Sequence, residues 1–261
     1  MSDITVTITG TASGVSTATR RHQCVAVESS GGSEGDSLFL LDCGDGTAHE
    51  LWRLGLPIGS MKALFVSHMH ADHTGGIPQL VQDLDLAHNH PEYMPQVDEL
   101  DIAMPPHGIE LFRQLFDSTI RPFEEIRCCP RFAPLSPGWT YESTGFTWDC
   151  LETAHRPGDN TSFAFRGRCG EKTVVYSGDM RSTAELEPWL AEGADLLVME
   201  CAHIFPLEDA LAQIAPHDVG RVVLSHISPN WDTRDAELLA AGERALPGRL
   251  AVGSDGMRID L

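Results

Sequence analysis

Four side chains able to bind a metal lie within six residues, and this cluster constrains the fold more than any other feature. They are His68, His70, Asp72 and His73. The apolar run Lys62–Ser67 before them predicts a buried strand that ends at His68, and Thr74-Gly75-Gly76 after them opens an amphipathic helix. Neutral imidazoles and a carboxylate on such a turn suit Zn²⁺, with Mn²⁺ or Fe²⁺ as alternatives. The chain must therefore place this turn at the edge of a sheet.

Three later strands are each followed by a single His or Asp, which supplies further ligands. These are His155 after Phe146–Thr153, Asp179 after Thr173–Tyr176 and His226 after Arg221–Ser225. Side chains at the carboxyl ends of strands mark the site in α/β folds. Seven ligands are too many for one tetrahedral Zn²⁺, but they suit two divalent ions that share a carboxylate and a hydroxide.

The order of the remaining patterns predicts one domain, residues 1–261, without a linker or an internal repeat. The other predicted strands are Ile4–Thr9, Gln23–Glu28, Ser37–Leu41, Ala63–Ser67, Leu100–Met104, Ser162–Arg166, Asp195–Glu200 and Arg249–Val252. The predicted helices are Thr47–Leu54, Thr74–Leu86, Ile109–Thr119, Ser182–Glu192, Pro206–Ile214 and Thr233–Ala245. Strands dominate the first half and alternate with helices in the second, which predicts sheets packed face to face with helices outside.

The charge balance argues against nucleic acid or membrane as a partner. The chain has 38 acidic and 18 basic residues, a formal charge of -20, and Lys62 and Lys172 are its only lysines. Non-specific binding to nucleic acid or to anionic lipid needs a positive surface. We therefore expect a small-molecule substrate, with no nucleic acid and no membrane.

The compartment is expected to be the cytoplasm. The first residues show neither the basic nor the apolar part of a signal peptide, and no apolar run approaches the length of a membrane span. The seven cysteines are scattered and odd in number, which is typical of reduced thiols rather than of a disulfide framework.

A series of motifs resembles the metallo-β-lactamase superfamily, and within it the ribonuclease Z-like branch. The motifs are Gly10–Gly14 with Arg20, Leu41–Thr47, His68–His73, His155 with Asn160–Arg166, Tyr176–Asp179, Met199–Cys201, Leu224–Pro229 and Asp255–Met257. The resemblance covers nearly the whole chain. It implies a four-layer αββα sandwich of the α/β (α+β) class, with a dinuclear site along one edge.

The resemblance also implies a division of the ligands. His68, His70 and His155 would hold the first metal, and Asp72, His73 and His226 the second, with Asp179 between them. Lactam-cleaving members typically have a cysteine at the bridging position, so Asp179 argues against that activity. By the same resemblance Asp42 would orient the ligand loop; a turn-capping role before Gly44 is the alternative.

The branch further implies a glutamate and a nearby histidine that donates a proton to the leaving oxygen. Here Glu200 and His203 would take these roles, and the free oxygen of Asp72 would orient the nucleophile. His203 as an ordinary helix-start residue is the alternative reading, and His217 is a weaker candidate for the acid.

Departures from the branch bear on the substrate. Members that process transfer RNA carry a long glycine- and proline-rich arm, whereas only 23 residues separate His155 from Asp179. Residues 85–95 are predicted to form a loop over the active edge, where His88 and His90 could contact substrate; solvent-exposed loop histidines are the alternative. Six arginines could still form a basic mouth beside the metals: Arg20, Arg21, Arg156, Arg166, Arg168 and Arg181.

These features predict a binuclear metal-dependent hydrolase that uses a metal-bridging hydroxide on a phosphodiester. The alternatives are the same site acting on an arylsulfate or a lactone, and an iron-dependent oxidoreductase on the same fold. Relatives in the branch are often dimers, so the resemblance also suggests a homodimer.

Overall fold

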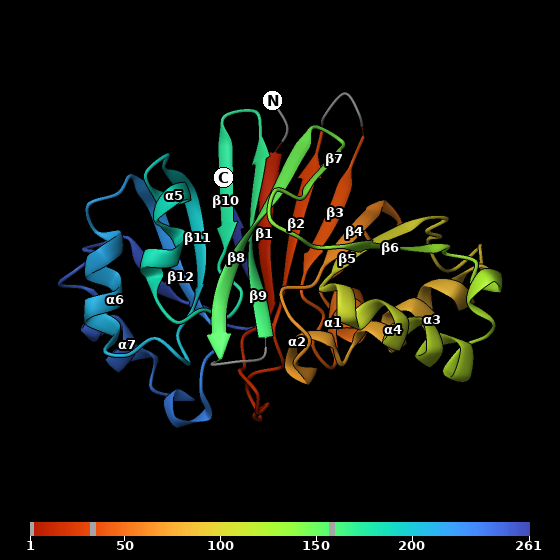
Figure 1. Cartoon of the computed structure of the whole chain (residues 1–261), viewed down its shortest axis with the longest axis horizontal. Helices are drawn as coiled ribbons and strands as arrows, with labels where there is room; N and C mark the ends of the chain where they lie inside the picture. The colour runs from red at the N-terminus through yellow and green to blue at the C-terminus, as the bar shows by residue number, and fades with distance from the viewer. Residues whose placement is uncertain (1–2, 32–34, 157–159) are drawn as a thin grey trace.

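Two mixed seven-stranded sheets face each other in the computed structural model of the chain, which describes residues 3–31, 35–156 and 160–261 (Figure 1). The first sheet has the order β14-β1-β2-β3-β4-β5-β6 and the second β13-β12-β11-β10-β9-β8-β7. The strands of the first are β1 Asp3–Gly10, β2 Cys24–Ser30, β3 Ser37–Leu41, β4 Met61–Phe65, β5 Leu100–Met104, β6 Pro130–Pro134 and β14 Met257–Asp260. Those of the second are β7 Thr140–Ser143, β8 Phe146–Arg156, β9 Asn160–Cys169, β10 Lys172–Tyr176, β11 Ala194–Glu200, β12 Val219–Ser225 and β13 Leu250–Val252.

Helices cover both outer faces of the sandwich, so the αββα prediction is confirmed. Helices α1, α3 and α4 pack on the first sheet, and α5, α6 and α7 on the second. The helices are α1 Thr47–Arg53, α2 Ala71–Thr74, α3 Ile77–Ala87, α4 Pro106–Thr119, α5 Glu187–Leu190, α6 Leu207–Ile214 and α7 Asp235–Gly242, and the 3-10 turns are Ile58–Ser60, Phe123–Glu125, Thr183–Leu186 and Pro229–Trp231. Among the described residues, no helix is both long and apolar enough to cross a membrane.

The alternating direction of side chains along each strand explains why each sheet is covered on both faces. In β3, Leu38 and Leu40 pack under the helices while Phe39 and Leu41 face the other sheet. Successive side chains of a strand point to opposite faces, so a strand that is apolar throughout must be covered on both.

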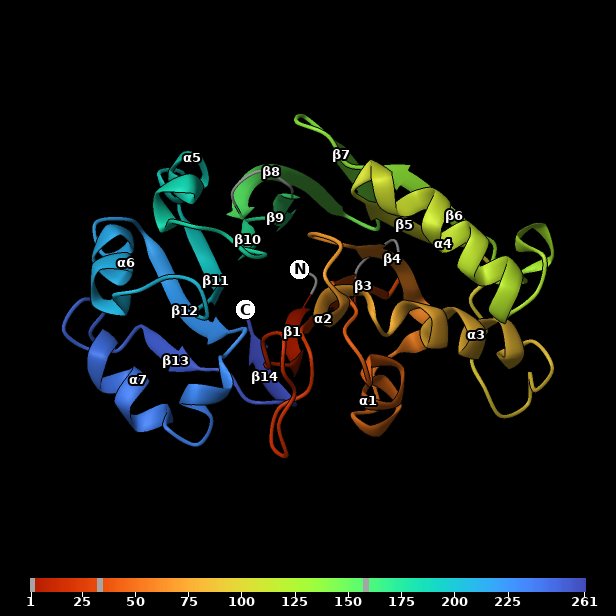
Figure 2. The ribbon, with the colours of Figure 1, turned by 60° about the horizontal axis from the view of Figure 1, so that its bottom comes forward.

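The parallel strands bring the site together. β3, β4 and β5 run parallel in the first sheet, and β10, β11 and β12 in the second. Carboxyl ends of parallel strands meet at one edge of a sheet, and Figures 1 and 2 show these two edges at the same end of the sandwich. Side chains at the ends of β4, β8, β10, β11 and β12, or just after them, therefore converge between the sheets.

Some predicted elements are wrong in extent. The helix expected over Thr74–Leu86 is two helices, α2 and α3, separated by Gly75 and Gly76. A Cβ at Gly76 would lie 2.2 Å from the carbonyl oxygen of Gly44, so this close approach requires glycine. The helices expected over 182–192 and 233–245 are shorter, and β6, β7 and β14 were not predicted.

Candidate metal centre

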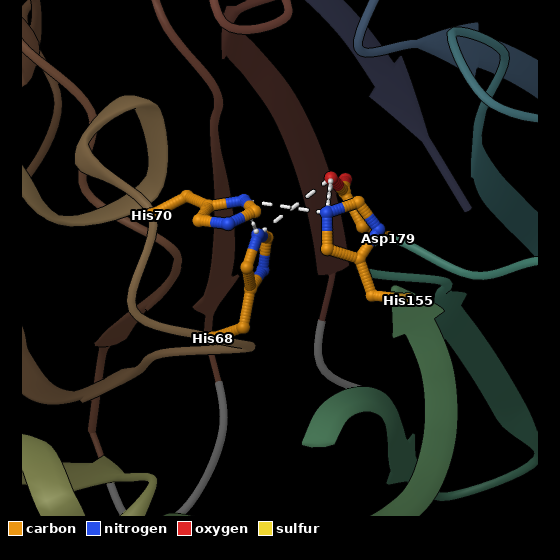
Figure 3. Close-up of side chains that lie close together, drawn as sticks. All are labelled: His68, His70, His155 and Asp179. Atoms are coloured by element: carbon orange, nitrogen blue, oxygen red, sulfur yellow. Dashed lines mark hydrogen bonds and ion pairs between the residues drawn. The ribbon is translucent and has the colours of Figure 1, made fainter. Parts of the chain in front are cut away.

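Four of the predicted ligands form one group between the sheets (Figure 3). His70 Nδ1 lies 2.9 Å from His68 Nε2 and 3.3 Å from His155 Nε2. Asp179 Oδ2 lies 3.6 Å from His68 Nε2 and 3.5 Å from His155 Nε2. Four ligand atoms, one from each side chain, thus lie within 4.8 Å of one another.

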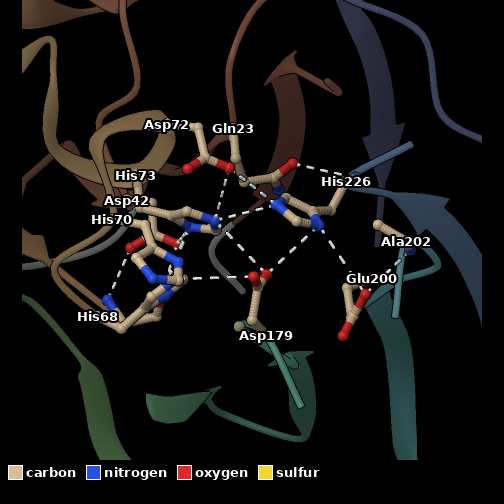
Figure 4. A network of polar contacts seen from close by, with 12 residues as sticks. Gln23, Asp42, His68, His70, Asp72, His73, Asp179, Glu200, Ala202 and His226 are labelled. Atoms are coloured by element: carbon tan, nitrogen blue, oxygen red, sulfur yellow. Dashed lines mark hydrogen bonds and ion pairs between the residues drawn. The ribbon is translucent and has the colours of Figure 1, made fainter. Parts of the chain in front are cut away.

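The other three predicted ligands form a second group that adjoins the first (Figure 4). His226 Nε2 lies 3.1 Å from both His73 Nε2 and Asp72 Oδ2. The second oxygen of Asp179, Oδ1, lies 3.5 Å from His73 Nε2 and 3.4 Å from His226 Nδ1. The carboxylate of Asp179 therefore faces both groups, one with each oxygen.

The donor set fits a pair of divalent ions. Asp179 is 1% exposed, and its Oδ1 receives no hydrogen bond from any residue that the structure describes. A buried carboxylate oxygen without a donor is costly unless a cation is close to it. The imidazole nitrogens of neighbouring histidines lie 2.9–3.3 Å apart, and His and Asp are ordinary Zn²⁺ ligands.

Asp42 orients the ligand loop rather than capping a turn. It is fully buried and its Oδ1 accepts the backbone N–H of Ser67 at 2.6 Å. Its Oδ2 lies 2.7 Å from His73 Nδ1 and accepts the hydroxyl of Tyr176 at 2.5 Å. With Nδ1 of His73 held by Asp42, Nε2 of the same ring is left for the centre.

Glu200 and His203 meet beside Asp179. Glu200 is buried and accepts the backbone N–H groups of Met180, Ala202 and His203 at 2.9–3.0 Å. His203 Nδ1 lies 3.2 Å from both Glu200 oxygens and 3.6 Å from Asp179 Oδ2. The His203 side chain is 35% exposed, so it forms part of the mouth of the site.

Burial and neighbouring charges act in opposite directions on the pKa values of the site residues. Burial would raise the pKa of Glu200, but hydrogen bonds with His203 and His226 lower it to about 2. Burial would lower the pKa of His226, but Asp179 and Asp72 raise it to about 9. Burial and neighbouring imidazoles lower the pKa of His68, and the hydrogen bond with Glu200 raises the pKa of His203. His203 therefore keeps its proton more readily than a free histidine does.

Other histidines considered from the sequence do not join the cluster. His217 Nε2 lies 2.9 Å from Glu187 Oε2 and precedes β12, at the opposite end of that strand from His226. His88 Nε2 lies 3.1 Å from the carbonyl oxygen of Val97, and His90 is exposed.

The predicted loop over the active edge is wrong. Residues 88–95 follow α3 at the outer end of the molecule in both ribbon views (Figures 1 and 2). The buried carboxylate of Asp85 binds Arg121 at 2.7 Å and the backbone N–H of Arg127 at 2.9 Å. These bonds tie the end of α3 to the segment after α4, away from the ligands.

The hypothesis of a basic mouth is also wrong for the described side chains, because acidic partners hold most of these arginines. The pairs are Arg20 with Asp232 and Asp235, Arg21 with Glu50 and Asp255, and Arg166 and Arg168 with Asp149. Arg181 Nε donates to the carbonyl oxygen of His155 at 3.4 Å and so lies beside the site. The side chain of Arg156 is outside the described part of the chain.

Sequence reasoning missed two supporting residues, Gln23 and Tyr176. The Gln23 side-chain oxygen accepts the Ser225 hydroxyl at 2.9 Å and the backbone N–H of His226 at 3.1 Å. The signal in the sequence is an amide that directly precedes the apolar run Cys24–Val27, because a polar side chain buried there needs a hydrogen-bond partner.

The fold and the two clusters define a metallo-β-lactamase fold protein related to ribonuclease Z. A family model described as "Anti-Pycsar protein Apyc1" matches residues 4–215. The chain belongs to this family of ribonuclease Z-like proteins.

Three relatives illustrate the similarity. Ribonuclease Z of Prochlorococcus marinus strain MIT 9303 is 43% identical, over 87% of each chain. Ribonuclease Z of Bradyrhizobium diazoefficiens is 26% identical over 96% of this chain and 98% of its own. The metallo-β-lactamase fold protein YhfI of Bacillus subtilis is 22% identical, with a TM-score of 0.77 over 100% of both chains.

Proposed function

We propose that the protein is a metal-dependent phosphodiesterase that hydrolyses small cyclic nucleotides. The observation that carries the proposal is the pair of His/Asp groups that meet at Asp179, with His203 beside them. The family match supports this substrate class, since Apyc1 proteins are cyclic nucleotide-degrading phosphodiesterases.

The proposed ligands follow the two groups. His68, His70 and His155 would hold one ion, Asp72, His73 and His226 the other, and Asp179 would contact both. Zn²⁺ fits this imidazole-rich set best, and Mn²⁺ or Fe²⁺ are the alternatives. When bound, two divalent ions lower the pKa of the attacking water and stabilise the attacking and leaving oxygens of an in-line displacement.

The chain's own residues would supply orientation and a proton. The free oxygen of Asp72 would orient the attacking water. His203 has its Nδ1 directed to Glu200, which leaves Nε2 to donate a proton. In a cyclic nucleotide the leaving group is a sugar alkoxide that remains attached to the product. This oxygen is strongly basic. Protonation by His203 Nε2 would therefore accelerate the breaking of the bond between phosphorus and the leaving oxygen.

Hydrolysis by the purified protein tests the proposal. Metal-loaded protein is incubated with cyclic CMP and cyclic AMP, and the linear nucleoside monophosphate is quantified by chromatography. Asp179→Asn, which keeps the shape but removes the charge, should lose at least about 10²-fold in rate. Phosphomonoesters, arylsulfates and lactones form the comparison panel. Preferential turnover of a sulfate or a lactone would contradict the proposal.

Purified protein also separates the iron-dependent oxidoreductase alternative. Elemental analysis together with an absorption spectrum distinguishes colourless zinc from redox-active iron. A zinc hydrolase should keep its activity when zinc is the only metal supplied, whereas an iron-dependent oxidoreductase should not.

A further inference from the structure

Three segments begin beside the metal centre, and the third contacts each of the other two: residues 13–20, 201–206 and 226–235. The first segment begins beside a ligand, because a Cβ at Gly14 would lie 4.0 Å from Asp72 Oδ2. The second contains His203 and follows β11, and the third begins with His226 at the end of β12. All three therefore start at the site itself.

Hydrogen bonds and an ion pair tie the first segment to the third. The backbone N–H of Ser13 donates to the carbonyl oxygen of Ile227 at 3.1 Å. The hydroxyl of Thr19 donates to Asp232 at 2.7 Å, and the buried guanidinium of Arg20 lies 3.4 Å from the same carboxylate. The segment after β12 is thus fixed against the segment beside Asp72.

An aromatic stack joins the second segment to the third. The rings of Phe205 and Trp231 are nearly parallel, at 9°, with centroids 6.0 Å apart. The guanidinium of Arg234 lies 4.4 Å from the Trp231 ring centroid, so the indole is held by a second contact. Phe205 is two residues after His203 and Trp231 is five after His226. The ring centroids of His203 and His226 lie 5.4 Å apart, so the two segments that form the stack both leave from the metal centre.

Phe205 remains 49% exposed despite this stack. An exposed aromatic ring held in place by a neighbour loses little conformational entropy when a flat ligand stacks on it. Base–aromatic stacking is tolerant of base identity because every base has a π-face. Stacking of this kind would bind a nucleotide without a base-specific hydrogen bond.

We propose that Phe205, supported by Trp231, is the platform on which the base of the substrate stacks while its phosphodiester lies at the metal centre. This inference rests on the proposed cyclic nucleotide substrate and assigns the recognition of its base. Stacking contacts the base equally before and during the reaction, so it contributes to substrate binding and not to the chemical step.

Steady-state kinetics test this role with cyclic phosphodiester substrates that carry or lack a nucleobase. Phe205→Ala should raise KM for cyclic CMP and cyclic AMP by about 5- to 100-fold and change kcat by less than about threefold. The same variant should leave the hydrolysis of the corresponding cyclic sugar phosphate without a base unchanged. Phe205→Trp restores an aromatic face and should keep KM near the wild-type value. Tyr93→Ala, which removes an 80% exposed aromatic ring on the segment after α3, is the matched control and should change nothing.

Binding measured without turnover gives a second readout. Calorimetry with a cyclic adenosine phosphorothioate and metal-loaded protein should show weaker binding to Phe205→Ala by the same factor. An unchanged KM in Phe205→Ala would overturn the role of Phe205 as a stacking platform. Equal losses of activity on substrates with and without a nucleobase would overturn it as well. Wild-type protein that hydrolyses the base-free diester but no cyclic nucleotide would instead overturn the proposed function, a result distinct from either of these.

Discussion

The side-chain oxygen of Gln23 accepts the backbone N–H of His226 at 3.1 Å, and His226 has a φ of +51°. The left-handed region is unfavourable for a residue with a Cβ, so neighbouring contacts must hold His226 in place. Gln23 directly precedes β2 of the first sheet, and His226 directly follows β12 of the second. This hydrogen bond therefore fixes a ligand of the second group from the opposite sheet.

Replacing Gln23 should weaken the second metal position. Gln23→Ala removes the acceptor for His226 and for the Ser225 hydroxyl. We expect the affinity for the second equivalent of Zn²⁺ to fall about 10- to 100-fold, as for other residues that orient a metal ligand. Calorimetric titration of metal-free protein measures it, and Gln114→Ala, an exposed amide on α4, is the control. Equal affinity in Gln23→Ala and wild type would show that packing alone holds His226.

Two metal ions should bind per chain. The expectation comes from the two ligand groups, which the two oxygens of Asp179 face. Elemental analysis after mild dialysis should give close to two equivalents, and Asp179→Ala should lose at least one. Chelation should lower the melting temperature, because ions that bind only the folded chain stabilise it. One equivalent in metal-replete wild-type protein would contradict a binuclear centre.

His203→Ala should damage substrates with basic leaving groups more than those with acidic ones. Removal of a general acid typically costs about 10²–10⁴-fold when the departing oxygen is an alkoxide. A p-nitrophenolate needs little protonation, so its rate should fall much less. Rates for cyclic CMP and for bis(p-nitrophenyl) phosphate provide the comparison. A uniform loss would make His203 a positioning residue.

The stability provided by Asp85 should depend on pH. Burial would raise the pKa of Asp85, but hydrogen bonds from Arg127 and the charge of Arg121 lower it below the ordinary range. A carboxyl with a lowered pKa in the fold stabilises it above the pKa of the unfolded chain, and this stabilisation is lost as the pH falls through the folded pKa.

Asp85→Asn should therefore lower the free energy of unfolding by about 1–3 kcal/mol at pH 7, toward the lower end because both arginines are near one-third exposed. The difference from wild type should narrow below about pH 4. Thermal unfolding across pH measures it, and Asp83→Asn, a more exposed carboxylate on the same helix, is the control. A difference that does not vary with pH would exclude the charge as its cause.

The ligand groups could be predicted because the ligands lie at the end of an apolar strand or on the turn that follows it. Val222, Val223 and Leu224 are fully buried and lead straight to His226. In parallel strands this pattern alone brings distant residues to one edge. The end of an apolar strand and the type of side chain found there are local features, so both can be recognised in the sequence.

The supporting contacts could not be predicted in the same way. Gln23 and His226 are 203 residues apart, and their hydrogen bond depends on how the two sheets face each other. Residues 88–95 were misplaced because a polar connection has the same composition near a site or far from it. Its position is decided by Asp85, Arg121 and Arg127, whose pairing exists only once α3 and α4 have packed.

The chain should not process precursor transfer RNA efficiently, despite its similarity to ribonuclease Z. The 23 residues between His155 and Asp179 include β9 and β10, and the alignment with the Bradyrhizobium enzyme spans 310 positions although this chain has 261 residues. That ribonuclease therefore has segments without a counterpart here. The formal charge is -20, and four of the six arginines considered for the mouth are paired with carboxylates. Gripping a folded RNA needs several phosphate contacts, because counterions released at each supply much of the affinity.

Cleavage of a precursor transfer RNA and of cyclic CMP at matched enzyme concentration measures the difference, and kcat/KM should be far lower for the RNA. A higher kcat/KM for the RNA would mean that another element, for example one from a second copy of the chain, provides the missing grip.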